Sequence, residues 1–324
     1  MPPVLSAVKN VEKTATLALS SETFQALETF RKELSGFVKG KEALVDSMTC
    51  AILSSGHVLL EDIPGVGKTT LIKAISRLLG LQMRRVQCTS DLLPSDIIGV
   101  EVFSSATQSF EFHKGPLFSN IVLADELNRA SPRTQSALLE AMGEGFVTVD
   151  RHTYELPKPF ILFAAQNPSD HIGTYPIPES QLDRFSVKLR LDYPSEEKER
   201  DIFMKSVLNP VASLPENCLS KNELEKIQSQ LETVYIADRV AAYAKRFIDA
   251  TRQHESIKRG VSTRGGVIWL RIARARAILF GRDYVTPDDL LATGSACLSH
   301  RVITHTGNDA NHVIEHLLNT IEIE

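Results

Sequence analysis

The segment LEDIPGVGKTTL, residues 60–71, contains the Gly-Lys-Thr sequence with which a phosphate-binding loop ends. In such a loop, backbone N–H groups surround the phosphates, a lysine reaches the β- and γ-phosphates, and the hydroxyl that follows binds Mg²⁺. Gly65 and Gly67 let the backbone approach the phosphates closely, while Lys68 and Thr69 supply the ammonium group and the hydroxyl. The segment therefore predicts a site for ATP and Mg²⁺.

Asp62 stands where the pattern G-x-x-x-x-G-K-[ST] has its first glycine. That glycine permits an unusual backbone turn, and aspartate is among the few other residues that tolerate one. Pro64 stiffens the turn, and a helix that begins at Lys68 directs its positive N-terminal dipole at the bound anion. Asp62 therefore weakens the match to the pattern more than it weakens the chemistry. The alternative is a glycine-rich turn between a strand and a helix.

A pair of carboxylates follows the apolar run of NIVLADELNRA, residues 120–130. The end of a buried parallel strand lies at the carboxyl edge of the sheet, where ligands of α/β proteins bind. We expect Asp125 to hold Mg²⁺ and Glu126 to polarise the attacking water. Alone, the pair would indicate only an acidic turn, but the phosphate loop upstream favours the catalytic interpretation.

Three further polar residues stand where they could act on the phosphates. Asn167 ends the segment FILFAAQN and could orient the attacking water, or it could simply terminate a strand before Pro168. Arg184, in ESQLDRF, could stabilise the transition state at a neighbouring subunit's ATP, or pair locally with Asp183 or Glu179. Arg264, in GVSTRGG, could reach over the nucleotide from a helix start, or be a solvated arginine.

Alternating strands and helices must position these residues. Helical spacing is predicted at 68–80 and 131–145, with Gly80 and Gly143 near the ends as C-caps. Short apolar runs predict buried strands at 56–62, 84–90, 120–126 and 160–167. Strands separated by helices indicate an α/β fold with a parallel sheet and helices on both of its faces.

Three regions are predicted along the chain. The first is a helical lead whose helix is capped by Ser21 or Thr23. The second is the α/β core, which two hairpin-like insertions interrupt at 100–115 and 146–157. The third is mostly helical in pattern and begins near Pro194. The lead, the core and the helical region are assigned to residues 1–36, 37–193 and 194–324.

The composition is that of a globular protein in the cytoplasm. The chain has 324 residues, of which 43% are hydrophobic and 23% charged, with a net charge of −4. A negative net charge does not indicate a general affinity for nucleic acid. No stretch of about 18 apolar residues predicts a membrane span, and no secretory signal is recognised. The four cysteines fit neither a disulfide framework nor a zinc pattern, and we interpret them as small buried side chains in a reducing compartment.

In order and spacing, these elements resemble the MoxR group of the AAA+ ATPases. The resemblance covers most of the chain, from about Val38 to His300. It rests on long segments: LEDIPGVGKT, DLLPSDIIG, FHKGPLFSNIVLADELNRASPRTQSALLEAM, AAQNPSDHIGTYPIPESQLDRF, TPDDL and LSHRV. The resemblance implies an αβα core and a C-terminal helical lid, assembled into a hexameric ring that binds ATP between subunits. It also implies a protein client, and family members often act beside proteins with von Willebrand factor A domains or assist metal-cofactor maturation.

The resemblance also implies roles for individual residues. Lys68 and Thr69 belong to the Walker A motif, and Asp125 and Glu126 form Walker B. Sensor 1, the arginine finger and sensor 2 correspond to Asn167, Arg184 and Arg264. The remaining nucleotide contacts are assigned to Val38, Asp62, Pro64, Gly65, Val66, Gly67 and Thr70.

Two segments depart from the family pattern. SDHI, residues 169–172, replaces an Ile-Glu-Gln-Glu-like segment, which puts in doubt any contact made there. STRG replaces the usual Ser-Pro-Arg, which leaves Arg264 in place but makes its helix start less rigid.

Other interpretations compete with this one. HVIEH, residues 312–316, matches an inverted zinc-protease pattern, but only Glu322 and Glu324 remain to supply a third ligand, so a solvated helix is favoured. A run of basic residues could contact DNA, although a lid helix that faces the nucleotide, or a solvated face, is favoured. The run comprises Lys258, Arg259, Arg264, Arg271, Arg274 and Arg276.

For the whole protein, the rivals are a nucleic-acid-directed motor, a metal-chelatase-type motor subunit and a nucleotide switch that does not hydrolyse ATP.

Overall fold

The computed structural model describes most of the chain. Its residues are 19–38, 40–61, 65–149, 152–167, 173–193, 211–305 and 309–322. Within these ranges, no helix is both long enough and apolar enough to cross a bilayer.

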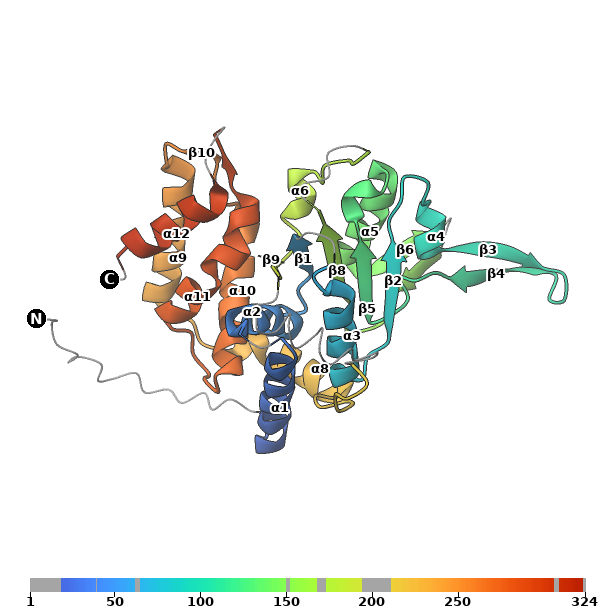
Figure 1. Cartoon of the computed structure of the whole chain (residues 1–324), viewed down its shortest axis with the longest axis horizontal. Helices are drawn as coiled ribbons and strands as arrows, with labels where there is room; N and C mark the ends of the chain where they lie inside the picture. Colours follow the sequence, from blue (N-terminus) through green and yellow to red (C-terminus); the bar gives the residue numbers. More distant parts are fainter. Residues whose placement is uncertain are drawn as a thin grey trace, which may run out of the picture.

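A five-stranded sheet forms the centre of the core (Figure 1). Its strand order is β2-β5-β8-β1-β9, and every neighbouring pair is parallel. The strands are β1 (Val58–Glu61), β2 (Met83–Gln87), β5 (Ile121–Asp125), β8 (Ile161–Gln166) and β9 (Val187–Leu189). The first four confirm the strands predicted from the apolar runs.

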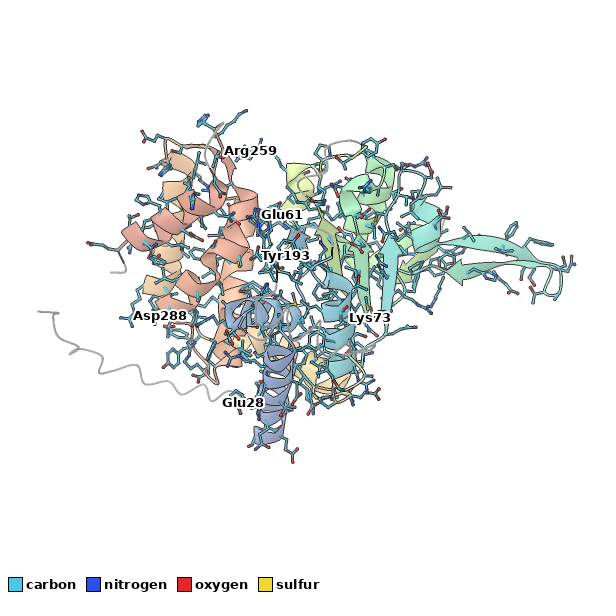
Figure 2. The ribbon with its side chains drawn as sticks, viewed as in Figure 1. Glu28, Glu61, Lys73, Tyr193, Arg259 and Asp288 are labelled. Atoms are coloured by element: carbon cyan, nitrogen blue, oxygen red, sulfur yellow. The ribbon has the colours of Figure 1, made fainter. Side chains whose placement is uncertain are left out.

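The edge strand β9 was not predicted. It is only three residues long and carries Lys188 between two buried apolar residues, so it has no continuous apolar run. Lys188 is accommodated because its ammonium group lies 3.3 Å from a carboxylate oxygen of Glu61, which also receives a hydrogen bond from Arg190. Figure 2 shows Glu61 between the core and the helical domain, where β1 ends.

Helices cover both faces of the sheet. Leu60 and Leu123 belong to a buried cluster shared with α1 to α3, whereas Leu59 and Val122 belong to a second cluster shared with α4 and α5. This alternation follows from the two-residue period of a strand, which sends successive side chains to opposite faces. The chain therefore has the expected αβα layers. These helices are α1 (Ser21–Phe37), α2 (Glu42–Leu53), α3 (Lys68–Leu79), α4 (Pro94–Ile98) and α5 (Pro132–Glu144).

The helix ends correct two of the predicted caps. Helix α1 is capped by Ser20, whose hydroxyl accepts a hydrogen bond from the amide of Thr23, rather than by Ser21 or Thr23. Helix α5 continues through Gly143 to Glu144 and is capped by Gly145, which has a φ of 71°. A left-handed residue ends a helix, and it is Gly145 that adopts this conformation. Gly80, which ends α3 with a φ of 60°, is the cap that was expected.

Both insertions form hairpins. The longer hairpin consists of β3 (Gly99–Ser104) and β4 (Ser109–Lys114) and projects from the core as an arm (Figure 1). The shorter consists of β6 (Phe146–Val149) and β7 (His152–Glu155). The two hairpins contact each other, because the rings of Phe112 and Tyr154 stack with centroids 4.2 Å apart.

The C-terminal part is a helical domain beside the core (Figure 1). Trp269 and Phe247 lie in its interior, and both are fully buried. A short linking helix, α6 (Glu179–Leu182), faces this domain from the core. The domain contains α9 (Asp238–Gln253), α10 (Thr263–Leu279), α11 (Pro287–Leu298), α12 (Ala310–Thr320), the 3-10 turns η2 (Leu231–Thr233) and η3 (Ser299–Arg301), and the strands β10 (Ile257–Arg259) and β11 (Ile303–Thr304). Helix α8 (Lys221–Gln230) lies instead below α3, at the foot of the core (Figure 1).

A buried histidine joins three elements of the core. Nδ1 of His57 accepts a hydrogen bond from the amide of Leu162 at 3.0 Å, and Nε2 donates to the carbonyl of Met142 at 3.1 Å. This pattern requires a neutral imidazole. Burial disfavours the charged ring and lowers the pKa of His57 from 6.5 to about 4.

We expect His57 to make the stability of the core depend on pH. The unfolded chain binds a proton at this imidazole near pH 6.5, whereas the folded chain does so only near pH 4. Stability should therefore fall as the pH is lowered from 6.5 to 4, with about 3 kcal/mol due to His57. Urea unfolding of the wild-type protein and His57→Gln across this range tests this. The variant should show the shallower decline, and equal declines would contradict the assignment.

Candidate functional site

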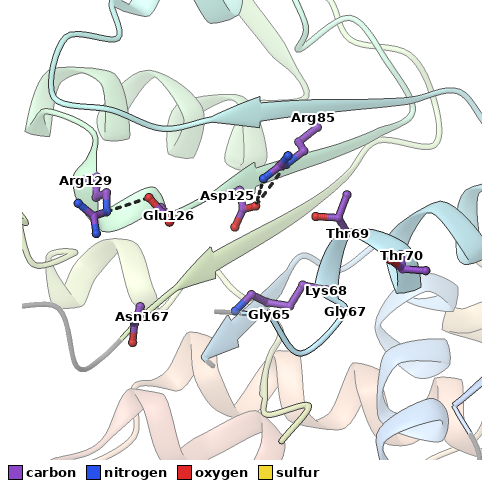
Figure 3. A pocket seen from close by; sticks show the side chains of 10 residues that line it. All are labelled: Gly65, Gly67, Lys68, Thr69, Thr70, Arg85, Asp125, Glu126, Arg129 and Asn167. Carbon is purple, nitrogen blue, oxygen red and sulfur yellow. Dashed lines mark hydrogen bonds and ion pairs between the residues drawn. The ribbon is translucent and has the colours of Figure 1, made fainter. Parts of the chain in front are cut away.

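A cavity of about 460 Å³ opens at the carboxyl edge of the sheet. Its size is typical of pockets that bind small molecules. Figure 3 shows that its walls come from the loop before α3, from β2, and from the ends of β5 and β8. The lining residues are Gly65, Gly67, Lys68, Thr69, Thr70, Arg85, Asp125, Glu126, Arg129 and Asn167.

The loop before α3 has the backbone of an anion site. Gly65 and Gly67 have φ angles of 86° and 91°, a left-handed region that favours glycine. Gly67 is the N-cap of α3, so the N–H groups of the first turn lie at the end of the helix that borders the cavity. Lys68, the first residue of the helix, extends into the cavity (Figure 3). The arrangement suits a phosphate group.

Asp125 is the last residue of β5 and is mostly buried. Its Oδ2 atom accepts a hydrogen bond from Arg85 Nη2 at 2.6 Å, and Nε of the same arginine lies at 3.2 Å (Figure 3). Arg85 was not predicted as a site residue. Strand β2 places it there because Gln87 pairs in register with Asp125, and Arg85 lies two residues earlier on the same face.

Glu126 has an unusual backbone conformation. Its φ of 55° and ψ of 45° lie in the left-handed region, which costs a non-glycine residue about 1–3 kcal/mol. Its carboxylate faces Arg129, whose Nε lies 2.8 Å from Oε2, and both residues line the cavity (Figure 3). Arg129 was also missed. Its signal in the sequence is its position three residues after Glu126. The single turn of η1 (Leu127–Arg129) brings the two side chains together.

Asn167 follows the end of β8 and lines the same cavity. Its carbonyl accepts a hydrogen bond from the side chain of Asn128 at 3.3 Å, which ties the end of β8 to the turn after β5. The structure thus brings together Lys68, Asp125 and Asn167, which are far apart in sequence but were predicted to act together. The cavity can hold a phosphate group, a divalent cation and a water.

Arg184 lies away from this cavity, against α5. Its Nη1 atom donates to the carbonyl of Leu139 at 2.8 Å and lies over Gly143. The local acids that were considered as its partners bind other residues. Asp183 pairs with Arg301 at 3.0 Å, and Glu179 pairs with Arg259.

Other predicted nucleotide contacts lie outside the lining of the cavity. Val38 and Val66 pack against the core cluster. Arg264 is exposed on the first turn of α10. Asp62, Pro64 and the segment 169–172 fall outside the residues that the structure describes.

The donor set of the cavity fits Mg²⁺. Thr69 offers a hydroxyl and Asp125 a carboxylate, and both are hard oxygen ligands of the kind that Mg²⁺ takes together with phosphate oxygens. By contrast, His312 and His316 are exposed on α12. Among the described residues, no group of three His, Cys, Asp or Glu side chains is arranged to hold a metal ion.

Acidic or backbone groups engage most of the basic run. Arg274 pairs with Glu232, and Arg276 lies 2.6 Å from the buried carboxylate of Asp289. Arg271 donates to the carbonyl of Ser54 at 3.1 Å, and Arg259 pairs with Glu179. These contacts favour a structural role for the four arginines over a continuous surface for DNA.

Gly143 gives a test of how Arg184 is held. A Cβ atom at this position would collide with Nη1 of Arg184. Because the guanidinium group is flexible, Gly143→Ala should displace Arg184 without unfolding the protein, and alanine should favour the helix by about 1 kcal/mol. If Arg184 is the arginine finger that the resemblance implies, ATP turnover should fall about tenfold or more, since small misplacements of a catalytic group are costly.

Gly36→Ala is the matched control, because Gly36 lies in α1 with no atom within 4 Å of an added Cβ. It should leave turnover unchanged. Melting temperatures and steady-state ATP hydrolysis of both variants provide the readout. A fully active Gly143→Ala protein would show that the position of Arg184 on α5 does not matter.

Comparison with known proteins covers both the core and the helical domain. Residues 57–187 match the model of the ATPase family associated with various cellular activities (AAA), and residues 249–317 match an AAA lid domain. The uncharacterized protein YeaC of Bacillus subtilis is 43% identical over 290 residues, which cover 88% of this chain and 90% of YeaC. Chaperone MoxR1 of Mycobacterium tuberculosis is 37% identical over 280 residues, which cover 84% of this chain and 74% of that protein.

A solved structure agrees with these similarities. A crystal structure from Cytophaga hutchinsonii matches with a TM-score of 0.85 at 34% identity, over 94% of this chain and 97% of the other. The match therefore extends across the cavity, the sheet and the helical domain together.

Proposed function

Because this chain belongs to the MoxR family of AAA+ ATPases, we propose that it hydrolyses ATP in the cavity at the sheet edge and uses the energy to remodel a protein client. One observation carries the proposal. The phosphate-binding turn, Asp125, Glu126 and Asn167 come from separate segments and line a single cavity. A switch that only bound nucleotide would not need a carboxylate held in a strained turn beside the phosphate site.

Each group has a distinct part in the reaction. The amides after Gly67 and the ammonium group of Lys68 hold the phosphates in place. Glu126 polarises the attacking water, and Asn167 orients it. Thr69 and Asp125 would hold Mg²⁺, and the bound ion would neutralise charge on the phosphates.

Arg129 supports Glu126 in this scheme. The ion pair between them restrains the carboxylate of Glu126 in one orientation. The oxygen that Arg129 does not bind would then face the phosphates. In the same way, the ion pair with Arg85 on the neighbouring strand restrains the carboxylate of Asp125.

The arginine finger comes from the next subunit. Arg184 lies outside the lining of its own cavity and against α5, where it is available to an adjacent copy of the chain. The family resemblance implies a hexameric ring in which each ATP lies between two subunits. A charge from the neighbour then completes each site only after assembly.

The client is a protein, and the resemblance favours one with a von Willebrand factor A domain. We assign contact with the client to the two hairpins, of which the longer carries exposed Phe103 and Phe110 at its tip. All four cysteines are free, as suits the reducing cytoplasm in which we place the assembly.

Hydrolysis should require Mg²⁺ and be independent of zinc. The experiment measures phosphate release by the purified chain after chelation, with Mg²⁺ or Zn²⁺ added back, and compares it with a His312→Ala/His316→Ala variant. Turnover should return with Mg²⁺ and be equal in both proteins, because the site offers hard oxygen ligands. Stoichiometric zinc that is lost from the double variant together with activity would contradict this.

A further inference from the structure

The segment that carries Arg184 is held by the lid of its own subunit. Arg301, the last residue of η3, is 7% exposed and reaches from the lid into the core. Its Nε donates to Asp183 Oδ1 at 3.0 Å. Its Nη2 donates to the backbone carbonyls of Asp183, at 3.2 Å, and of Phe185. One guanidinium group therefore binds the backbone on both sides of Arg184.

The same guanidinium is anchored within the lid. Its Nη1 atom donates to the carbonyl of Cys297, at the end of α11. Arginine has five N–H donors in a fixed planar arrangement, and here the donors are divided between the lid and the finger segment. The buried guanidinium therefore links the end of α11 to the carbonyls of Asp183 and Phe185.

A second contact joins the finger segment to α10. Ser262, the N-cap of α10, accepts a hydrogen bond from the amide of Gly265 and donates to the carboxylate of Asp183 at 3.1 Å. Arg301 also packs on this first turn, because a Cβ atom at Gly265 would lie 2.7 Å from Arg301 Cδ. The turn that bears Arg264 is thus in contact with both members of the ion pair.

These three residues, Asp183, Ser262 and Arg301, form what we term the lid–finger clamp. Two peripheral contacts strengthen it: the ion pair of Arg259 with Glu179, and the approach of His300 Nε2 to the carbonyl of Phe185 at 3.0 Å. Figure 2 shows Arg259 at the end of the lid that faces the core. Every contact reaches the segment 179–186, which comprises α6 and the residues that connect it to β9.

We propose that Arg301 is a positioning residue for the Arg184 finger, so that the finger follows the lid of the subunit that donates it. This inference rests on the proposed trans action of Arg184. It implies that a movement of the lid in one subunit changes hydrolysis of the next subunit's ATP. The ring would then couple its sites through the clamp, in one direction around the ring.

Arg301→Lys tests the clamp. Lysine keeps the charge near Asp183 but cannot bind both flanking carbonyls in a planar fork. We expect ATP binding and ring assembly to persist, while turnover falls about 10- to 100-fold, the scale of a catalytic group misplaced by about 1 Å. Arg271→Lys is the matched control, since Arg271 also joins α10 to the core but at Ser54, away from the finger. Unchanged turnover in Arg301→Lys would overturn the proposal.

Mixed rings separate positioning of the finger from a defect in the subunit's own site. Arg301→Lys subunits keep Glu126, whereas Glu126→Gln subunits keep the clamp and Arg184. If Arg301 acts through the finger, mixing the two should restore turnover at interfaces where an Arg301→Lys site receives an intact finger. A mixture that co-assembles and stays inactive would show that Arg301 supports its own nucleotide site instead.

Two further experiments keep the result interpretable. A parallel mixture of Arg184→Ala with Glu126→Gln tests trans action itself. If this mixture also stays inactive, the proposed function is wrong; if only the mixture with Arg301→Lys stays inactive, the clamp is wrong.

Asp183→Asn retains the shape of the clamp but removes the charge of Asp183, and it serves if Arg301→Lys does not fold. It should lower turnover without loss of ATP binding and be rescued in the same mixture; full activity would contradict the clamp.

Discussion

Replacing Glu126 by glutamine should leave ATP bound and almost unhydrolysed. Glutamine has nearly the same shape but cannot accept a proton from the attacking water. A general base contributes about 10²–10⁴-fold to the rate, so turnover should fall by this factor. ATP affinity should persist, because the phosphates are held by the turn at Gly65 to Thr69 on the other side of the cavity.

Lys68→Ala provides the contrast for this result. Its ammonium group belongs to the phosphate-binding part of the cavity, so this variant should lose ATP binding as well as turnover. Equilibrium binding of a labelled nucleotide and single-turnover hydrolysis separate the two effects. If Glu126→Gln hydrolysed ATP at near the wild-type rate, the assignment of Glu126 as the base would be wrong.

Replacing Arg184 by alanine should have the largest effect of all. An arginine finger raises the rate by about 10³–10⁵-fold, or about 4–7 kcal/mol of transition-state stabilisation. Arg184→Ala should therefore abolish turnover while ATP binding stays nearly unchanged, since Arg184 does not line the cavity of its own subunit. The hydrogen bond to Leu139 would be lost as well, but a half-exposed contact of this kind affects mainly stability, by about 1 kcal/mol.

Arg184→Lys tests whether a positive charge alone is enough. Lysine carries the charge but lacks the planar guanidinium, so we expect only a small recovery of turnover. Thermal unfolding of both variants shows whether the loss is one of stability. A variant that binds ATP, assembles and turns over normally without Arg184 would contradict the role of this residue.

Much of the site could be predicted because its chemistry is concentrated at the ends of apolar strands. The run before Asp125 and the glycines before Lys68 each indicate both an element and a site, and parallel strands bring such ends together at one edge. The structure agrees with this placement, and the roles of the individual residues stay proposals.

Arg85 and Arg129 could not be predicted in the same way. An arginine in a strand predicts only that its side chain is exposed, unless the neighbouring strand is known. The register of β2 against β5 brings Arg85 to Asp125. Arg129 depends on the left-handed turn at Glu126, a conformation that the residue type does not favour. The lid–finger clamp is more distant still, because Asp183 and Arg301 lie 118 residues apart.

The helix ends and the last strand show a related limit. Gly143 and Gly145 both lie where α5 could end, and only the backbone conformation distinguishes them. Strand β9 depends on pairing with β1 and on the partnership of Lys188 with Glu61, both of which are tertiary contacts. Such features follow from packing rather than from the pattern of nearby residues.

The central claim is that ATP is hydrolysed between subunits, with Glu126 from one and Arg184 from the next. Mixing Arg184→Ala and Glu126→Gln proteins, each inactive alone, tests it most directly. In randomly mixed rings, about a quarter of interfaces join an intact Glu126 to a neighbour's intact Arg184, so trans action predicts that turnover reappears. A mixture that demonstrably co-assembles and remains inactive would contradict the account, because rings in which Arg184 served its own subunit would contain no complete site.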